Sequence, residues 1–209
     1  MQFFRKQNAP SDRVPPGQHL VTSFPVLHYG SVPRVDLSKW TFRVWGLVEE
    51  EITWTYPEFT ALPTIHIVRD IHCVTTWSKL DTEWAGVAVS ELMRHVRLKP
   101  EARFVLVHAE QGFTTNLALD DFVRAPFANE VVRGTDFVRD DNLFAWRYAG
   151  AELTPEHGWP LRLVVPHLYF WKSAKWVRGV EFLAQEKLGF WETHGYHPRG
   201  DPWTEERFG

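Results

Sequence analysis

Short segments with β-strand patterning dominate this sequence, and turn-forming residues separate them. Alternation of apolar and polar side chains over about four to eight residues indicates a half-buried strand, whereas longer amphipathic periods indicate helices. Helix-like patterns are few and short here. Many short strands with few short helices favour an α+β domain built around mixed β-sheet, which is the fold class that we predict. The strands are expected at residues 41–48, 65–74, 103–108, 112–117, 143–148, 161–165 and 175–183.

Short helical segments complete the predicted fold. The first has a capping Thr55, Pro57 in its first turn and Glu58 at the third helical position, and it should end near Leu62. Further helical turns are expected at residues 90–96 and 119–124. Since no linker divides the chain, we expect one domain over residues 1–209, in which residues 1–20 form an extended lead-in.

The charge and the cysteine content exclude several classes of protein. The formal net charge is -3 and the sequence pI is about 6.4, so no global positive field would attract nucleic acid. A single cysteine, Cys73, rules out an internal disulfide. No uncharged apolar run is long enough to span a bilayer, and the N-terminus lacks the apolar core of a secretory signal. We therefore expect a cytoplasmic protein with no membrane span and no nucleic-acid partner.

Cys73 is the first candidate for chemistry. It follows His72 where a predicted strand ends, so the strand would deliver it to a loop. A thiolate binds soft metals or attacks electrophiles, whereas a lone buried thiol often serves only as a small apolar side chain. Neighbouring residues on a strand point to opposite faces, which makes a direct pair of His72 and Cys73 geometrically poor. The residues alone leave a metal ligand, a nucleophile and an inert thiol open.

A second candidate is a group of cations late in the chain. Arg162 lies in a predicted strand, and Lys172 and Lys175 follow it closely. If the strand and the next loop fold onto one site, the three cations could bind a phosphate, and backbone N–H groups of the turn containing Ser173 and Ala174 could complete an anion nest. A solvated charged turn is the alternative.

Other familiar sites have weak support. His194 and His197 stand in a Gly- and Pro-rich turn without the helical spacing of a metalloprotease. The sequence contains no glycine-rich dinucleotide fingerprint, no Walker A motif and no nucleophile elbow.

Taken together, these segments resemble the sulfite oxidase-type molybdopterin-binding domain, and in particular the single-domain sulfite oxidase-like oxidoreductases. The resemblance extends from about Val21 to the last residues, and the order and spacing of the cysteine and Arg/Ser/Lys segments make it specific. It is carried by residues 24–30 (FPVLHYG), 72–78 (HCVTTWS), 84–87 (WAGV), 157–162 (HGWPLR) and 175–177 (KWV).

The resemblance implies a role for each matching residue. Cys73 matches the thiolate that binds molybdenum, and Arg162 matches the arginine that holds the phosphate of the pterin. Lys175 and its neighbours match a segment that wraps the cofactor, and residues 27–29 match a segment that lies on the pterin near the metal. The implied cofactor-binding set is Leu27, His28, Tyr29, Cys73, Ala109, His157, Arg162, Lys172, Ser173, Ala174 and Lys175.

The sequence departs from sulfite oxidases at two places near the expected metal. Residues 27–29 read Leu-His-Tyr where sulfite oxidases have Arg-Asn-His, and residues 74–78 contain no arginine. The second segment is closer to the Cys-Val-x-x-Trp-Ser of bacterial protein-methionine-sulfoxide reductases. A small dianion needs converging cations, so a pocket rim made by His28, Tyr29, His72 and Trp77 suggests a neutral, sulfoxide-like substrate.

Our hypothesis is a molybdenum–molybdopterin oxidoreductase without haem that transfers an oxygen atom to or from a small molecule. Cys73, His28 and Tyr29 are the candidate catalytic residues. A protein with one redox centre needs an external electron donor or acceptor, which the sequence does not identify. The alternatives are a molybdenum-cofactor-binding protein without turnover, a thiol enzyme that uses Cys73, and a structural domain whose eleven Trp residues fill its core.

Overall fold

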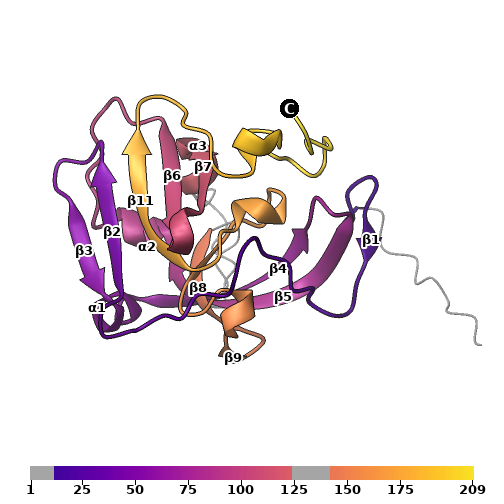
Figure 1. Ribbon diagram of the computed structural model, residues 1–209, viewed down its shortest axis with the longest axis horizontal. Helices are drawn as coiled ribbons and strands as arrows, with labels where there is room; N and C mark the ends of the chain where they lie inside the picture. The colour runs from indigo at the N-terminus through magenta and orange to yellow at the C-terminus, as the bar shows by residue number, and fades with distance from the viewer. Residues whose placement is uncertain (1–11, 124–141) are drawn as a thin grey trace, which may run out of the picture.

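Two β-sheets form the framework of the protein (Figure 1). The computed structural model describes residues 12–123 and 142–209. One sheet has five strands in the order β3–β2–β11–β6–β7, and only the pair of β11 and β2 is parallel. Its strands are β2 (Thr41–Gly46), β3 (Ile52–Thr55), β6 (Phe104–Ala109), β7 (Thr114–Ala118) and β11 (Val177–Leu183).

The second sheet is built around a long hairpin that reaches away from the five-stranded sheet in Figure 1. The hairpin strands pair antiparallel from Thr64↔Val87 to His72↔Ser78, with a register shift between Arg69 and Ile71. A parallel two-residue strand near the N-terminus pairs with the far end of the hairpin. The strands of this sheet are β1 (His19–Leu20), β4 (Thr64–His72), β5 (Trp77–Ala88), β8 (Leu143–Tyr148), β9 (Ala151–Glu152) and β10 (Arg162–Val164).

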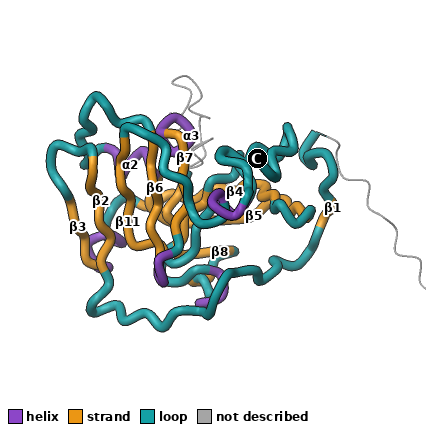
Figure 2. Tube along the Cα trace, turned by 45° about the horizontal axis from the view of Figure 1, so that its top comes forward, coloured by secondary structure: helices purple, strands orange, loops and turns teal. Residues whose placement is uncertain are grey.

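The helices are single short elements at the ends of strands (Figure 2). In α1 (Tyr56–Thr60), Thr55 and Glu58 form a reciprocal capping box, which satisfies free N–H groups at the helix start. The other two are α2 (Val89–Met93) and α3 (Leu119–Val123), and they pack on the core through Leu92 and Phe122. None of the described helices is long and apolar enough to cross a membrane.

The two faces of the second sheet take part in two separate apolar clusters. Phe144 and Leu163 face the first cluster, where they meet Phe42 and other inward side chains of the five-stranded sheet. Leu143 and Val164, one residue away on the same strands, face the second cluster, which also contains Cys73. Alternation along β8 and β10 therefore joins the main core on one side to the surroundings of Cys73 on the other.

Most of the expected elements are present, and the α+β fold class with mixed sheet is confirmed. The prediction of β8 matches residue for residue, and the predicted antiparallel pair at 103–108 and 112–117 corresponds to β6 and β7. The longest strand, β5, was not predicted, and neither were β1, β3 and β9. The helix expected at 90–96 ends at Met93, because residues after it turn away without further helical bonds of α type. Residues 1–11 of the expected lead-in, and Arg124, lie outside the described residues.

Candidate functional site

A cavity of about 590 Å³ opens where distant parts of the chain meet. Apolar side chains make up most of its wall, as is usual for a ligand site. Its lining residues come from the segments 24–29, 73–77, 110–113, 170–171, 173–176 and 190–196, together with Arg162.

Cys73 lines this cavity from the turn that joins β4 to β5. The turn is tight: the amide of Cys73 donates to Trp77 (2.8 Å), the amide of Thr76 donates to Cys73 (2.9 Å), and Thr76 has a φ of 75°. The Cys73 sulfur lies 3.1 Å from the hydroxyl oxygen of Thr75. Burial raises the pKa of the thiol, so without a positive ligand it stays protonated.

His72 points away from the cavity. Its Nδ1 lies 2.8 Å from the hydroxyl oxygen of Ser78, and burial lowers its pKa to about 4. The expectation that His72 forms part of the pocket rim is therefore wrong, because β4 turns its side chain to the other face of the strand. For the same reason His72 is not placed to activate Cys73. Trp77, also expected on the rim, does line the cavity.

Arg162 is a buried cation in the cavity wall. Its side chain is only 1% exposed, and it donates to the carbonyl oxygens of His157 (2.8 Å) and Ser173 (2.9 Å). The guanidinium lies over the ring of Phe170, 4.4 Å from its centroid. No carboxylate of the described chain pairs with it, and burial lowers its pKa to about 9. Its Nε–H donates to the carbonyl oxygen of Leu163 (3.5 Å), which leaves two of its five N–H groups for a bound anion.

Lys175 lies beside Arg162 in the same cavity. It donates to the carbonyl oxygens of Leu27 (2.8 Å) and Glu156 (2.5 Å) and forms no ion pair with the described carboxylates. Burial and the charge of Arg162 lower its pKa to about 7. Gly158, with a φ of 113°, allows this proximity, since a Cβ there would lie 3.0 Å from Cβ of Arg162. Two adjacent cations without a carboxylate form a site for an anion.

The turn before Lys175 contributes backbone donors. The amides of Lys172 and Ser173 are occupied, since they donate to the carbonyls of Tyr169 and Phe170. Within the described chain the amides of Ala174 and Lys175 donate to no protein acceptor. The nest expected from the sequence is thus reduced to its last two residues, next to the two cations.

Lys172 does not belong to this cluster, contrary to the sequence prediction. Its side chain has no exposed surface, does not line the cavity, and pairs with Glu192 at 2.6 Å. The 3₁₀ turn η3 (Phe170–Lys172) directs it to the side opposite Lys175, toward the C-terminal segment. Of the three predicted cations, Arg162 and Lys175 therefore line the cavity, and Lys172 forms a buried ion pair elsewhere.

The remaining predicted residues fall into two groups. Leu27, His28 and Tyr29 line the cavity, as do Ser173 and Ala174. Ala109 and His157 do not. Ala109 precedes the β6–β7 turn, and the ring of His157 stacks on Phe24 at 4.1 Å behind Arg162. The Nδ1 atom of His157 is buried and has no hydrogen-bond partner within the described chain, and burial together with Arg162 lowers its pKa to about 4.

Sequence reasoning missed one wall of the cavity. Phe190, Trp191 and Tyr196 come from the C-terminal segment and line the cavity. Tyr29 packs on Phe190 at 4.5 Å, so this segment meets the segment of residues 24–29 there. A local cluster of aromatic residues was the available signal, but it has no strand or helix period and does not indicate which way the rings point.

Comparison with known proteins identifies the family. The model of the oxidoreductase molybdopterin-binding domain matches residues 29–191. The chain belongs to this family. It is a molybdopterin-binding oxidoreductase, as the resemblance of its motifs implied.

Relatives and solved structures agree with this assignment. The chain is 47% identical over 204 residues to the uncharacterized oxidoreductase YuiH of Bacillus subtilis, covering 97% of this chain and 96% of YuiH. It is 28% identical over 163 residues to the catalytic subunit of the protein-methionine-sulfoxide reductase MsrP of Campylobacter jejuni, covering 76% of this chain and 54% of MsrP. The sulfane dehydrogenase SoxCD of Paracoccus pantotrophus has the same fold, with a TM-score of 0.64 at 19% identity over 85% of this chain and 48% of that one.

The residues of the cavity fit a molybdenum–pterin group. Cys73 offers a thiol of the soft type that suits this metal. Arg162 and Lys175, with the two free amides, offer an anion site for a phosphate, and the unpartnered nitrogen of His157 lies behind Arg162. The aromatic walls between these two ends can cover a flat ring system.

Proposed function

We propose that this protein carries molybdenum–molybdopterin without haem and transfers an oxygen atom from a neutral, sulfoxide-like substrate. When bound, the cofactor would supply the two-electron change that this reaction requires. Cys73 would hold the metal, and Arg162 and Lys175 would hold the phosphate. Overall, a sulfoxide, two electrons and two protons give a sulfide and water, and the electrons come from an external donor.

The observation that carries the substrate class is the distribution of charge in the cavity. The charged side chains that line its described part are Glu110, Arg162 and Lys175. Glu110 is paired with Arg178 at 2.6 Å, and the other two belong to the anion site. Burial raises the pKa of Cys73, and the charge of Arg207 opposes this only in part; the Arg207 side chain donates to the carbonyl of Val74 and does not line the cavity.

Aromatic and hydroxyl side chains thus surround the Cys73 end of the cavity. Thr75, Trp77, Trp191 and Tyr196 all line it. A dianion such as sulfite would lose its hydration there without gaining ion pairs, whereas a neutral S=O dipole needs one hydrogen bond. Burial raises the pKa of Tyr196, and a negative charge on the nearby Cys73 sulfur raises it further. Its protonated phenol is suited to donate to the oxygen of the substrate.

The test is single turnover with the metal-loaded protein. The centre is reduced, then mixed with a dialkyl sulfoxide, free methionine sulfoxide or nitrate, while the oxidised centre is mixed with sulfite. We expect the sulfoxides to reoxidise the centre and sulfite to react slowly. Rapid reduction of the centre by low concentrations of sulfite, with no reaction of sulfoxides, would contradict the proposal. Tyr196→Phe should lower the rate with sulfoxide about tenfold to a hundredfold, the usual size for one proton donor.

The same experiment separates the rival functions. A loaded centre that reacts with none of these compounds would indicate a cofactor-binding protein without turnover. A thiol enzyme would keep its activity in cofactor-free protein and lose it on alkylation of Cys73. The structure gives that rival little support, since burial raises the pKa of Cys73 and His72 faces Ser78.

A further inference from the structure

The C-terminal segment after β11, residues 184–209, contributes a wall of the cavity without joining either sheet. Its 3₁₀ turn η4 (Glu192–His194) lies in the chain between Trp191 and Tyr196, and both of these aromatic residues line the cavity. The amide of Tyr196 donates to the carbonyl of Trp191 at 3.1 Å, and their rings are 5.0 Å apart. The two rings therefore pack on each other, and contacts outside the turn hold the chain around them: the amide of Phe190 donates to the carbonyl of Thr114 in β7 (2.8 Å), and the carboxylate of Glu192 pairs with Lys172.

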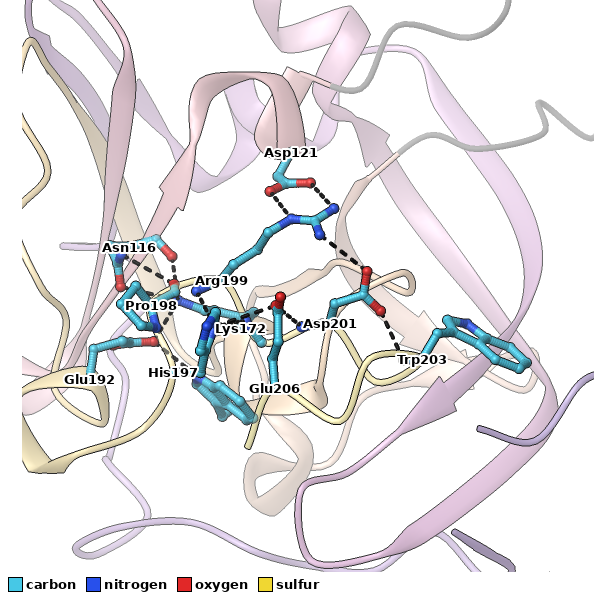
Figure 3. Close-up of polar contacts among 12 residues, drawn as sticks. Asn116, Asp121, Lys172, Glu192, His197, Pro198, Arg199, Asp201, Trp203 and Glu206 are labelled. Atoms are coloured by element: carbon cyan, nitrogen blue, oxygen red, sulfur yellow. Dashed lines mark hydrogen bonds and ion pairs between the residues drawn. The ribbon is translucent and has the colours of Figure 1, made fainter. Parts of the chain in front are cut away.

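Lys172 holds this turn through polar contacts with Glu192, Asn116 and Pro198 (Figure 3). Its buried ammonium lies 2.6 Å from Oε1 of Glu192 and donates to the carbonyl oxygens of Asn116 (2.8 Å) and Pro198 (2.5 Å). Oδ1 of Asn116 also lies within reach at 3.1 Å, so four oxygen atoms surround the three N–H groups of the ammonium. Two of these acceptors, in Glu192 and Pro198, lie on either side of Tyr196 in the chain, so a single cation holds both ends of the turn that carries the phenol.

Glu192 completes the network on the aromatic side. The same Oε1 atom accepts a hydrogen bond from the indole N–H of Trp171 at 2.8 Å. The ring of Trp171 also lines the cavity and packs edge-on against Tyr196 at 5.2 Å. Trp171 and Lys172 both belong to η3, the turn that leads into Ser173 and Lys175. Their contacts with Glu192 therefore connect residues 173–175, at the anion site, to the cavity wall that contains Trp191 and Tyr196.

We propose that Lys172 and Glu192 are positioning residues that set the place of Trp191 and Tyr196 at the metal end of the cavity. Their contribution to substrate affinity rests on the function proposed above. A buried ion pair adds little net stability compared with apolar residues of similar size, but it fixes one arrangement when every donor has an acceptor. Here the ion pair fixes the distance between residues 173–175, at the anion site, and the cavity wall that contains Trp191 and Tyr196.

The experiment compares metal-loaded wild-type protein with Glu192→Gln, which keeps an acceptor for Trp171 and removes the charge facing Lys172. A second variant, Lys172→Met with Glu192→Leu, replaces the pair with apolar side chains and keeps the interior free of an unpaired charge if Glu192→Gln folds poorly. Glu206→Gln is the matched control, because it makes the same chemical change in the same segment at a carboxylate that faces His197. Val105→Ala controls for a loss of stability in the five-stranded sheet.

Hydrogen exchange and steady-state kinetics are the two measurements. We expect Glu192→Gln and the double variant to keep their molybdenum content. The amides of Thr193, Gly195 and Tyr196 should exchange at least tenfold faster than in the wild type. KM should rise about tenfold, with a smaller change in kcat. The two controls should leave these amides and KM near wild type. Unchanged exchange at these amides, or changes no larger than those of Val105→Ala, would overturn the proposal. The exchange data need no substrate, so they decide the positioning role even if the proposed reaction is wrong.

Discussion

The side chains of Arg162 and Lys175 have charges that the cofactor-free protein does not compensate. Burial lowers the pKa of Lys175 from 10.5 to about 7 and that of Arg162 from 12.5 to about 9. A cation whose pKa is lowered by folding favours the neutral form in the folded state. Its cost to stability is therefore complete below the folded pKa and disappears as the pH rises to the unfolded pKa. A bound phosphate would reverse this effect by restoring the positive form.

The stability of the cofactor-free protein should therefore increase between pH 7 and pH 9, the range in which Lys175 loses its proton in the folded state but not in the unfolded one. Lys175→Met should flatten this rise. Urea unfolding at several pH values measures it, and Lys39→Met, an exposed lysine paired with Asp36, serves as the control. An equal rise in the wild type and in Lys175→Met would show that Lys175 does not carry the effect.

Cys73→Ser should separate metal binding from folding. Cys73 is 8% exposed and its sulfur contacts the Thr75 hydroxyl, so a serine of similar size fits the turn. We expect a change in unfolding free energy of about 1 kcal/mol or less, together with complete loss of activity and of the sulfur ligand to the metal. X-ray absorption at the metal and thermal unfolding measure the two effects. A fully active variant would contradict the assignment of Cys73 as the ligand.

At the level of whole elements, the sequence predicted strands best where one face of the strand is buried and the other is not. β2 illustrates this, since burial alternates along it, and the α1 capping box is likewise a local signal. β5 was not predicted, because it does not show the alternation of a half-buried strand. It has neighbouring strands along both edges, is buried at both ends, and contains Asp81 with a φ of 53°. The direction of Lys172 could not be predicted either, because a 3₁₀ turn of three residues sets it and has no sequence period.

Gly86 shows how closely the two long elements of the second sheet approach. It lies at the register shift where β5 crosses to β8, and a Cβ there would come within 2.0 Å of the carbonyl oxygen of Phe144. We expect Gly86→Ala to lower the unfolding free energy by about 3 kcal/mol or more, because backbone must move to relieve the overlap. Urea unfolding checks this value.

Gly150→Ala is the control for Gly86→Ala. Gly150 has a φ of 77° but nothing within 4 Å of its would-be Cβ, so the strain of a left-handed alanine, about 1 kcal/mol, should be the whole effect. Equal losses in the two variants would show that close approach of β5 and β8 is not what requires the glycine.

In the molecule as a whole, the cavity forms where residues from both sheets converge with residues 24–29 and 190–196. The sequence placed Cys73, Arg162 and Lys175 in one site through their resemblance to a family, and the structure brings these three together. The aromatic wall from residues 190–196 was not predicted, since it depends on where an irregular segment is anchored, and that anchor is a contact between residues far apart in sequence.

The N-terminal side of the cavity is held in a different way from this wall. Among the described residues, no backbone–backbone hydrogen bond involves residues 22–35, and the segment is fixed by side chains: Lys175 donates to Leu27, Gln111 donates to Ser31, and Phe24 packs on His157. Leu27 and Tyr29 are half or more exposed, at 50% and 62%. A segment with so few backbone bonds depends on what fills the cavity beneath it.

Removal of the cofactor should therefore loosen residues 22–35 first. We expect chymotrypsin to cut the cofactor-free protein after Leu27 or Tyr29 at least tenfold faster than the loaded protein, while cleavage elsewhere in the described chain changes less. Lys175→Met, which removes the bond to Leu27, should raise the cleavage rate of the loaded protein toward that of the cofactor-free form. Limited proteolysis with identification of the cut sites by mass spectrometry gives both rates. Equal cleavage at Leu27 and Tyr29 with and without cofactor would mean that the segment is held by its own side-chain contacts and that the cofactor does not lie against it.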